Sequence, residues 1–168
     1  QFSKANTYFQ QALQIYKETY GSLGNLYACV TLRDYGKSLR DQGDFEQAEK
    51  HLKLARDTWV RLASSGDHPK LISFDLALAV LEKRRKNYQV AFEQLKKVLA
   101  RQQHFFDITH PKTADIYLEL GEISLILSRK SEARDYFKKA DNIYKNHHFS
   151  EAHTNRVAVN KFITSLTT

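Results

Sequence analysis

Three histidines near the C-terminus, His147, His148 and His153, are the residues of this chain that most resemble a metal site. Imidazole nitrogens are common zinc ligands, and structural zinc sites usually combine them with cysteines at short, fixed spacings. No cysteine or carboxylate cluster accompanies these histidines at such a spacing, and they bracket an expected turn between two helices. We therefore expect no metal and no cofactor.

Cys29 is the single cysteine and the one candidate for a nucleophile. Nucleophilic catalysis needs a base within hydrogen-bonding reach, but no histidine lies at a recognisable spacing from Cys29. Its position suits a small residue of a helical core, and no phosphate-binding glycine loop occurs. The sequence therefore predicts a chain that is not an enzyme. A lone cysteine and the lack of a long apolar run favour a cytoplasmic setting without membrane insertion.

The chain is basic, with a formal net charge of +7. The positive charge is densest at residues 83–86, a Lys-Arg-Arg-Lys run, followed by Lys96, Lys97 and Arg101. Such a region can attract an acidic peptide, RNA or an anionic membrane surface. It can equally be a solvated face whose cations favour a helix C-terminus. We prefer the solvated face, then an acidic protein partner, with nucleic acid the least favoured.

Two His-Pro pairs lie 42 residues apart, His68-Pro69 and His110-Pro111, and the apolar pattern that follows each pair is the same. The pattern continues upstream, where Ala48 precedes Ala91 by 43 residues. A fixed period of this length is typical of stacked helical repeats. The repeated positions are Leu78, Ala79, Tyr88, Ala91, Leu95 and Val98 after the first pair, and Leu120, Gly121, Lys130, Ala133, Phe137 and Ala140 after the second.

The apolar periodicity predicts eight helices, and no strand-like alternation is long enough to compete. Pro69 and Pro111 are expected at helix starts, where a missing N–H costs nothing, and the preceding histidines are expected to shape the turns. Ser150 is expected to cap the last helix. The expected ranges are 3–20, 24–42, 45–63, 69–86, 88–104, 111–128, 130–146 and 150–166.

The order of small and large apolar positions resembles the tetratricopeptide repeat family. The 42-residue spacing is similar to the longer variant found in kinesin light chains and in many bacterial signalling proteins. The resemblance implies an all-α fold, a right-handed superhelical α-solenoid of antiparallel helix pairs. It is carried by Leu32, Tyr35, Gly36, Leu39, Gly43, Phe45, Ala48, Leu52 and Ala55, and covers nearly all of the chain.

The same resemblance implies one domain over residues 1–168, with helix pairs at 24–63, 69–104 and 111–146 and half repeats at 3–20 and 150–166. The last helix is apolar enough to pack on a following helix, so we expect the chain to be a fragment of a longer protein. Alternatively, that helix folds back on residues 130–146 as a cap. Its apolar residues are Val157, Val159, Phe162, Ile163 and Leu166.

In tetratricopeptide arrays the first helix of each pair lines a concave groove that binds peptides. When that register is applied to this chain, basic side chains line the groove on the first full repeat (the basic wall). Mostly apolar side chains line it on the next two repeats (the apolar floor). Apolar anchors of an acidic peptide or helix would then meet leucines and valine, while its carboxylates pair with arginines and lysine. The alternative is that the helices cover one another's apolar residues. The predicted groove residues are Arg33, Lys37, Arg40, Leu76, Val80, Lys83, Leu118, Glu122, Leu125, Asn160 and Thr164.

Two known binding modes of the family fit poorly. Kinesin light chain repeats use paired asparagines in the groove, and Asn160 alone matches such a position here. Chaperone-binding arrays clamp a C-terminal carboxylate, and only Arg33 and Lys37 fall at positions of that clamp. We therefore predict neither that cargo-binding mode nor chaperone-tail binding.

The sequence thus predicts a non-catalytic protein–protein interaction module that binds a peptide or helical segment of a partner. A second interpretation is a regulatory, sensor or oligomerisation segment of a larger signalling protein, such as an NTPase or a transcription regulator. A third is nucleic-acid binding through the basic surface. Self-association through the terminal helices is a further expectation.

Overall fold

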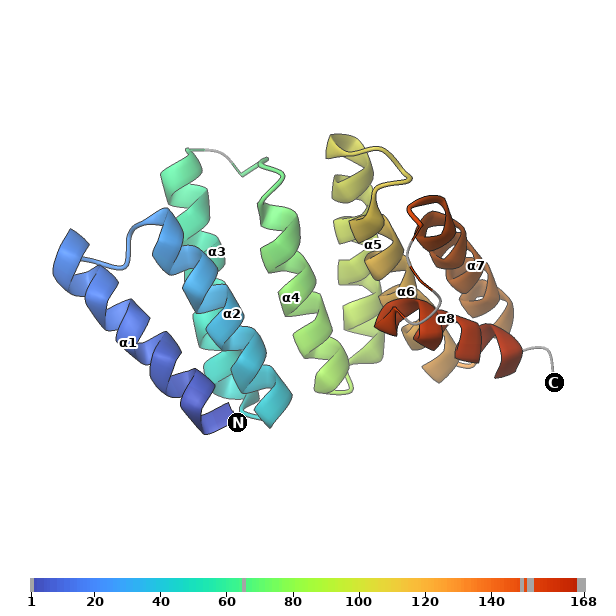
Figure 1. Cartoon of the computed structure of the whole chain (residues 1–168), viewed down its shortest axis with the longest axis horizontal. Helices are drawn as coiled ribbons and strands as arrows, with labels where there is room; N and C mark the ends of the chain where they lie inside the picture. Colours follow the sequence, from blue (N-terminus) through green and yellow to red (C-terminus); the bar gives the residue numbers. More distant parts are fainter. Residues whose placement is uncertain (1, 65, 149, 151–152, 166–168) are drawn as a thin grey trace. The chain divides into compact units, whose positions relative to one another are not determined.

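The computed structural model describes residues 2–64, 66–148, 150 and 153–165, and these form helices joined by short turns (Figure 1). The all-α prediction is confirmed, and the predicted ranges 45–63 and 130–146 match the observed helices. The helices of the described residues are α1 (Phe2–Tyr20), α2 (Leu26–Gln42), α3 (Phe45–Ala63), α4 (Leu71–Arg84), α5 (Tyr88–Phe105), α6 (Pro111–Ile126), α7 (Lys130–Asn146) and α8 (Thr154–Ser165).

The chain forms two compact units, residues 1–86 with α1 to α4 and residues 87–168 with α5 to α8. The boundary falls in the turn between α4 and α5, the two helices of the predicted middle pair. The division of residues 1–168 into helix pairs of a single domain stays a prediction.

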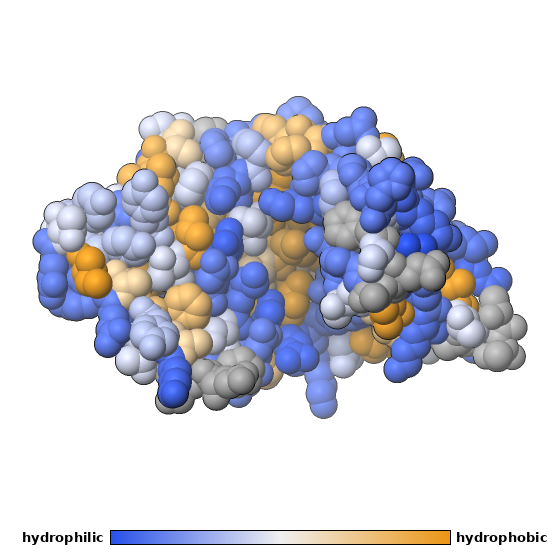
Figure 2. All heavy atoms as spheres, viewed as in Figure 1, coloured by the Kyte–Doolittle hydropathy of each residue, from blue (hydrophilic) through white to orange (hydrophobic). Residues whose placement is uncertain are grey.

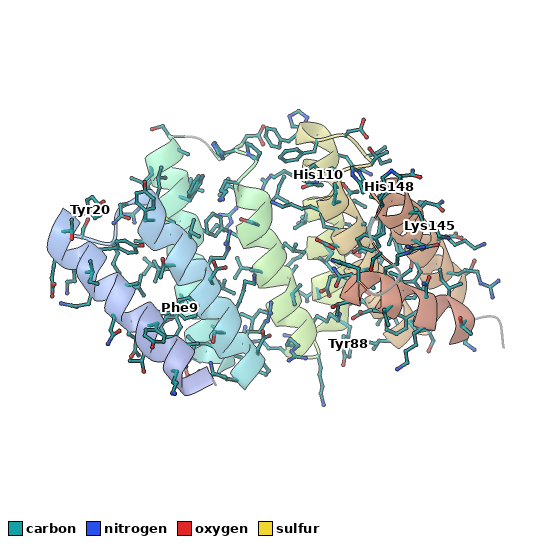
Figure 3. All side chains as sticks on the ribbon, viewed as in Figure 1. Phe9, Tyr20, Tyr88, His110, Lys145 and His148 are labelled. Atoms are coloured by element: carbon teal, nitrogen blue, oxygen red, sulfur yellow. The ribbon has the colours of Figure 1, made fainter. Side chains whose placement is uncertain are left out.

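In the first unit, α2 and α3 cross closely at Gly36. A β-carbon at Gly36 would lie 2.7 Å from Cγ of Leu52, so a side chain would not fit without movement. Phe9 points from α1 toward α2, where its ring stacks on Tyr35 with centroids 5.5 Å apart (Figure 3). Because Leu81 of α4 packs against the same core, all four helices of this unit share one apolar interior.

The second unit repeats this crossing at Gly121 of α6, where a β-carbon would lie 2.5 Å from Cε1 of Phe137 in α7. Phe137 is fully buried and stacks on Phe162 of α8, with ring centroids 4.8 Å apart and an interplanar angle of 7°. Val159 of α8 is also fully buried, so α8 folds its apolar face back onto α7. Val157 stays 50% exposed. Leu166 lies outside the described residues.

The His-Pro turns are built alike. Nδ1 of His68 accepts a hydrogen bond from the backbone N–H of Lys70, and Nδ1 of His110 accepts one from Lys112, both at 3.1 Å. The prediction that these histidines shape the turns is confirmed. Pro111 is the first residue of α6, as predicted.

Three predicted helix starts are wrong. The helix predicted from residue 24 begins at Leu26, because the Asn25 side chain caps it by accepting from the Ala28 N–H. The helix predicted from residue 69 begins at Leu71, because a tight turn with a hydrogen bond from the Leu71 N–H to the His68 carbonyl comes first. Ser150 does not cap α8, which begins at Thr154. The Ser150 carbonyl instead accepts from the His153 N–H at 3.0 Å, so a separate turn precedes the helix.

Candidate interaction surface

The basic side chains predicted to line one side of the groove on α2 lie beside aspartates of the same helix. The Arg33 guanidinium donates two hydrogen bonds to Asp34, each 3.0 Å long, and a third of 3.2 Å to Oγ of Ser73 in α4. It also lies over the ring of Phe74, 5.8 Å from the centroid. Arg33 therefore joins α2 to α4 and has little charge left to offer a ligand.

Arg40 is held in the same way, since it donates to Oδ1 of Asp41 at 2.9 Å from Nε. Only 12% of its side chain is exposed. Lys37 is different: its side chain is 47% exposed, and its Nζ lies 3.8 Å from Asp34. On this stripe Lys37 is the cation that reaches solvent, so the wall is mixed in charge and not purely basic.

Helix α4 supplies the apolar part of the predicted surface. Leu76 and Val80 are half-buried, as is Lys83 near the end of the helix. The rest of this nearly all-apolar helix is covered, and none of its apolar side chains is exposed. Only Leu76, Leu78 and Val80 are left partly accessible. The fully or almost fully buried positions are Leu71, Ile72, Phe74, Ala77, Ala79 and Leu81.

The predicted apolar floor of α6 is wrong at Leu118, which is only 7% exposed and packs in the core of the second unit. Leu125 is half-buried and packs against the same core. The partly accessible charged side chains of α6 are instead Asp115, Glu119 and Glu122. Glu122 is among the residues predicted from the sequence, and Asp115 and Glu119 are not.

Asp115 is the centre of a small polar network. It accepts a hydrogen bond from the Tyr144 hydroxyl at 2.7 Å and another from the Asn155 amide of α8 at 2.9 Å. Burial, followed by the bond to Asp115, raises the pKa of Tyr144 above its ordinary value, so this phenol stays a donor. The network fixes α8 against α6 and α7.

Within each unit the structure brings together part of the predicted set. Residues of α2 and α4 share one surface of the first unit, linked by Arg33 and Ser73. Residues of α6 and α8 share one surface of the second unit, linked by Asp115 and Asn155. On α8, Asn160 and Thr164 are exposed, and the Thr164 hydroxyl donates to the Asn160 carbonyl at 2.9 Å. Both linking pairs are 40 residues apart, a spacing that the repeat could have indicated.

His153 belongs to the repeat and not to a histidine cluster. It follows His110 by 43 residues, and its ring lies 6.0 Å from that of Tyr144. His68 makes the equivalent contact with Trp59 at 5.6 Å. The regular spacing of His68, His110 and His153 indicates this packing role, which was not predicted from the sequence.

Three other features bear on chemistry. Among the described residues, no three His, Cys, Asp or Glu side chains are grouped so that they could hold a metal ion. Cys29 is fully buried, and burial raises the pKa of its thiol to about 11, which disfavours the reactive thiolate at neutral pH. In the same described part of the chain no helix is long and apolar enough to span a bilayer.

The surface over α1 and α2 is mostly polar. Figure 2 shows hydrophobic side chains there as separate patches among hydrophilic ones.

These features define a helical repeat protein, and comparison with known proteins shows which repeats it is similar to. Residues 71–146 match the tetratricopeptide repeat family model. The chain is 24% identical over 144 residues to Protein KINESIN LIGHT CHAIN-RELATED 1 of Arabidopsis thaliana, a match that covers 86% of this chain and 23% of that protein. The chain therefore spans about a quarter of the length of this relative.

Two solved structures share the fold. BtubC (BKLC) from P. vanneervenii superimposes with a TM-score of 0.75 at 19% identity, over 99% of this chain and 64% of that one. Nearly identical TPR-like repeats from a candidate kinesin light chain of Podosopora anserina give 0.72 at 17% identity, over 99% and 77%. Residues 71–146 thus resemble tetratricopeptide repeats, and the fold of the chain is similar to that of these two repeat structures.

Proposed function

We propose that the α2/α4 surface of the first unit binds a peptide or helical segment of a partner protein. The observation that supports this is the position of Leu76 and Val80, partly accessible on α4, beside the charge pairs of the adjacent helix α2. Such a surface fits a segment with one or two apolar anchors. Lys37 would pair with an acidic residue next to those anchors.

The second unit contributes differently to this proposal. Glu122 on α6 stays a predicted contact residue, and its carboxylate would favour a basic residue of a ligand in place of the acidic ligand that the sequence predicted. Asn160 and Thr164 on α8 stay predicted contact residues. The partner's identity is left to experiment, and the cytoplasmic location stays a prediction.

A matched pair of variants tests the α2/α4 surface. Lys37→Glu/Leu76→Asp/Val80→Asp changes one exposed lysine and two apolar residues of the surface. Lys53→Glu/Leu54→Asp/Leu62→Asp makes the same changes on α3, where all three side chains are exposed. Partners captured by the wild type are identified by mass spectrometry, and their binding segments are then titrated as synthetic peptides.

We expect the first variant to weaken peptide binding at least about tenfold, since it buries carboxylates against apolar anchors, and the α3 variant to bind like the wild type. Because Val80 is half-buried, the milder Lys37→Glu/Leu76→Gln variant is measured beside it, and thermal unfolding confirms that each protein is folded. Equal binding by folded α2/α4 variants and wild type would show that this surface is not the site.

Oligomerisation through exposed apolar residues of α1 is a second candidate function. Tyr8 is 69% exposed and Ile15 is 58% exposed, one above the other on the same side of the helix. Sedimentation equilibrium of the wild type and of Tyr8→Glu/Ile15→Glu tests this candidate. A concentration-dependent mass that the variant loses would support it, and a monomeric wild type would exclude it.

A further inference from the structure

The second unit separates its charges between two surfaces. The carboxylates of α6 are half-buried, whereas most lysines of α5 and α7 are exposed to solvent. On the described parts of α5 and α7, the exposed carboxylates are Glu93 and Asp135. The outer surface of these two helices is therefore positive.

Four of these lysines occupy equivalent positions of the repeat. Lys96 and Lys97 of α5 are followed 42 residues later by Lys138 and Lys139 of α7. All four side chains are exposed, and together they form what we call the lysine face. Because a repeat puts equivalent residues on the same side of successive helices, the two pairs form two parallel rows.

Direct contacts hold the two rows beside each other. The ring of Phe92 in α5 lies 6.4 Å from that of Tyr136 in α7. Phe92 is four residues before Lys96, and Tyr136 is two residues before Lys138. Arg129 lies 5.1 Å over the Phe92 ring and donates to the Gln89 side chain at 2.9 Å. Lys139 leans over Tyr136, with its Nζ 5.9 Å from the ring centroid. The same Nζ lies 5.7 Å over the ring of Tyr117 in α6, so Lys139 is held by aromatic rings of both α6 and α7.

The lysine face is only partly balanced by the exposed carboxylates Glu93 and Asp135, which lie about one turn before its lysines. Lys96, Lys97 and Lys138 make no ion pair with any residue that the structure describes. Glu93, one turn before Lys97, accepts instead from the Gln89 amide at 2.9 Å. The four lysines outnumber the two carboxylates, and an anionic ligand would balance the excess positive charge.

We infer that the lysine face binds an acidic segment of a partner protein, at a surface separate from α2 and α4. Nucleic-acid surfaces typically add arginine forks or exposed aromatic rings that stack on bases, and no Phe, Tyr or Trp side chain is exposed on the described parts of α5 and α7. Membrane-surface helices insert large apolar residues, but here only Val90 is a large exposed hydrophobic. Lysine point charges without either feature suit a string of carboxylates.

The test uses the full chain and a fluorescein-labelled oligoglutamate peptide, with binding followed by fluorescence anisotropy at low salt. Lys96→Glu/Lys97→Glu/Lys138→Glu/Lys139→Glu reverses the lysine face. The matched control, Lys4→Glu/Lys17→Glu/Lys112→Glu/Lys161→Glu, reverses four exposed lysines elsewhere and so gives the same net charge. Circular dichroism confirms that both variants retain their helicity.

We expect the lysine-face variant to weaken peptide binding at least about tenfold and the control to change it less than about threefold, with binding falling as salt rises. Equal losses in the two variants would show a response to net charge alone and would overturn the proposal. Tighter binding to an oligothymidylate of equal charge, or to phosphatidylserine vesicles, would also overturn it, in favour of nucleic acid or a membrane surface.

Discussion

Gly121 of α6 crosses Phe137 of α7 so closely that a β-carbon at position 121 would lie 2.5 Å from Cε1 of the ring. Phe137 cannot move aside freely, because it is fully buried and stacks on Phe162. We therefore predict that Gly121→Ala lowers the free energy of unfolding by about 1–3 kcal/mol, despite the higher helix propensity of alanine. Urea unfolding followed by circular dichroism measures the loss.

Gly66→Ala is the control for this prediction, because a β-carbon there meets nothing within 4 Å. It should leave the free energy of unfolding within about 0.5 kcal/mol of the wild type. If Gly121→Ala behaved like Gly66→Ala, the close crossing of α6 and α7 would be wrong.

The turns from the first to the second helix of each pair predict stabilising substitutions. Gly43, Lys86 and Ser128 occupy equivalent positions and have φ values of 87°, 68° and 61°. A left-handed conformation costs about 1–2 kcal/mol for a residue with a β-carbon, and glycine avoids this cost. Lys86→Gly and Ser128→Gly should each stabilise the protein by about 0.5–1 kcal/mol, and Gly43→Ala should destabilise it by about 1 kcal/mol. A lower thermal midpoint for both glycine variants would contradict this.

The fold could be predicted from the sequence because a 42-residue period repeats both the apolar positions and the small residues at helix crossings. The exposure and ion pairing of the predicted groove residues could not be predicted from the sequence in the same way. Helix register places Leu118 on the predicted groove stripe, but α7 and α8 cover it. Register also places Arg33 and Arg40 on one stripe, yet each guanidinium pairs with the aspartate next to it in sequence. Whether a side chain is buried or ion-paired depends on the neighbouring helices and on side-chain rotamers, and a repeat pattern specifies neither.

The cap of α6 provides a third prediction. The imidazole of His110 accepts from the Lys112 N–H and so satisfies one of the free donors at the start of the helix. His110→Ala should lower the free energy of unfolding by about 1 kcal/mol, while His110→Asn, whose side chain can accept the same bond, should retain most of the stability. Chemical denaturation of the two variants distinguishes capping from packing against Phe106, because asparagine restores only the cap.

The salt bridge between α3 and α4 predicts a dependence of stability on pH. Hydrogen bonds from Lys53 and then from Arg85, whose Nη2 is 2.7 Å from Glu49, lower the pKa of the Glu49 carboxyl below 4.5. A carboxyl whose pKa is lower in the folded state stabilises the protein above the unfolded pKa and loses that contribution as the pH falls through the folded value.

Glu49→Gln should therefore cost about 0.5–1 kcal/mol at pH 7, a modest loss because the carboxyl is partly exposed, and the cost should shrink below pH 4.5. Glu46→Gln on the same helix is the control, since no ion pair of Glu46 is found among the described residues. Urea unfolding between pH 3 and pH 7 measures both variants. A cost for Glu49→Gln that stayed constant over that range would mean that the charge of Glu49 contributes nothing and that its effect is steric.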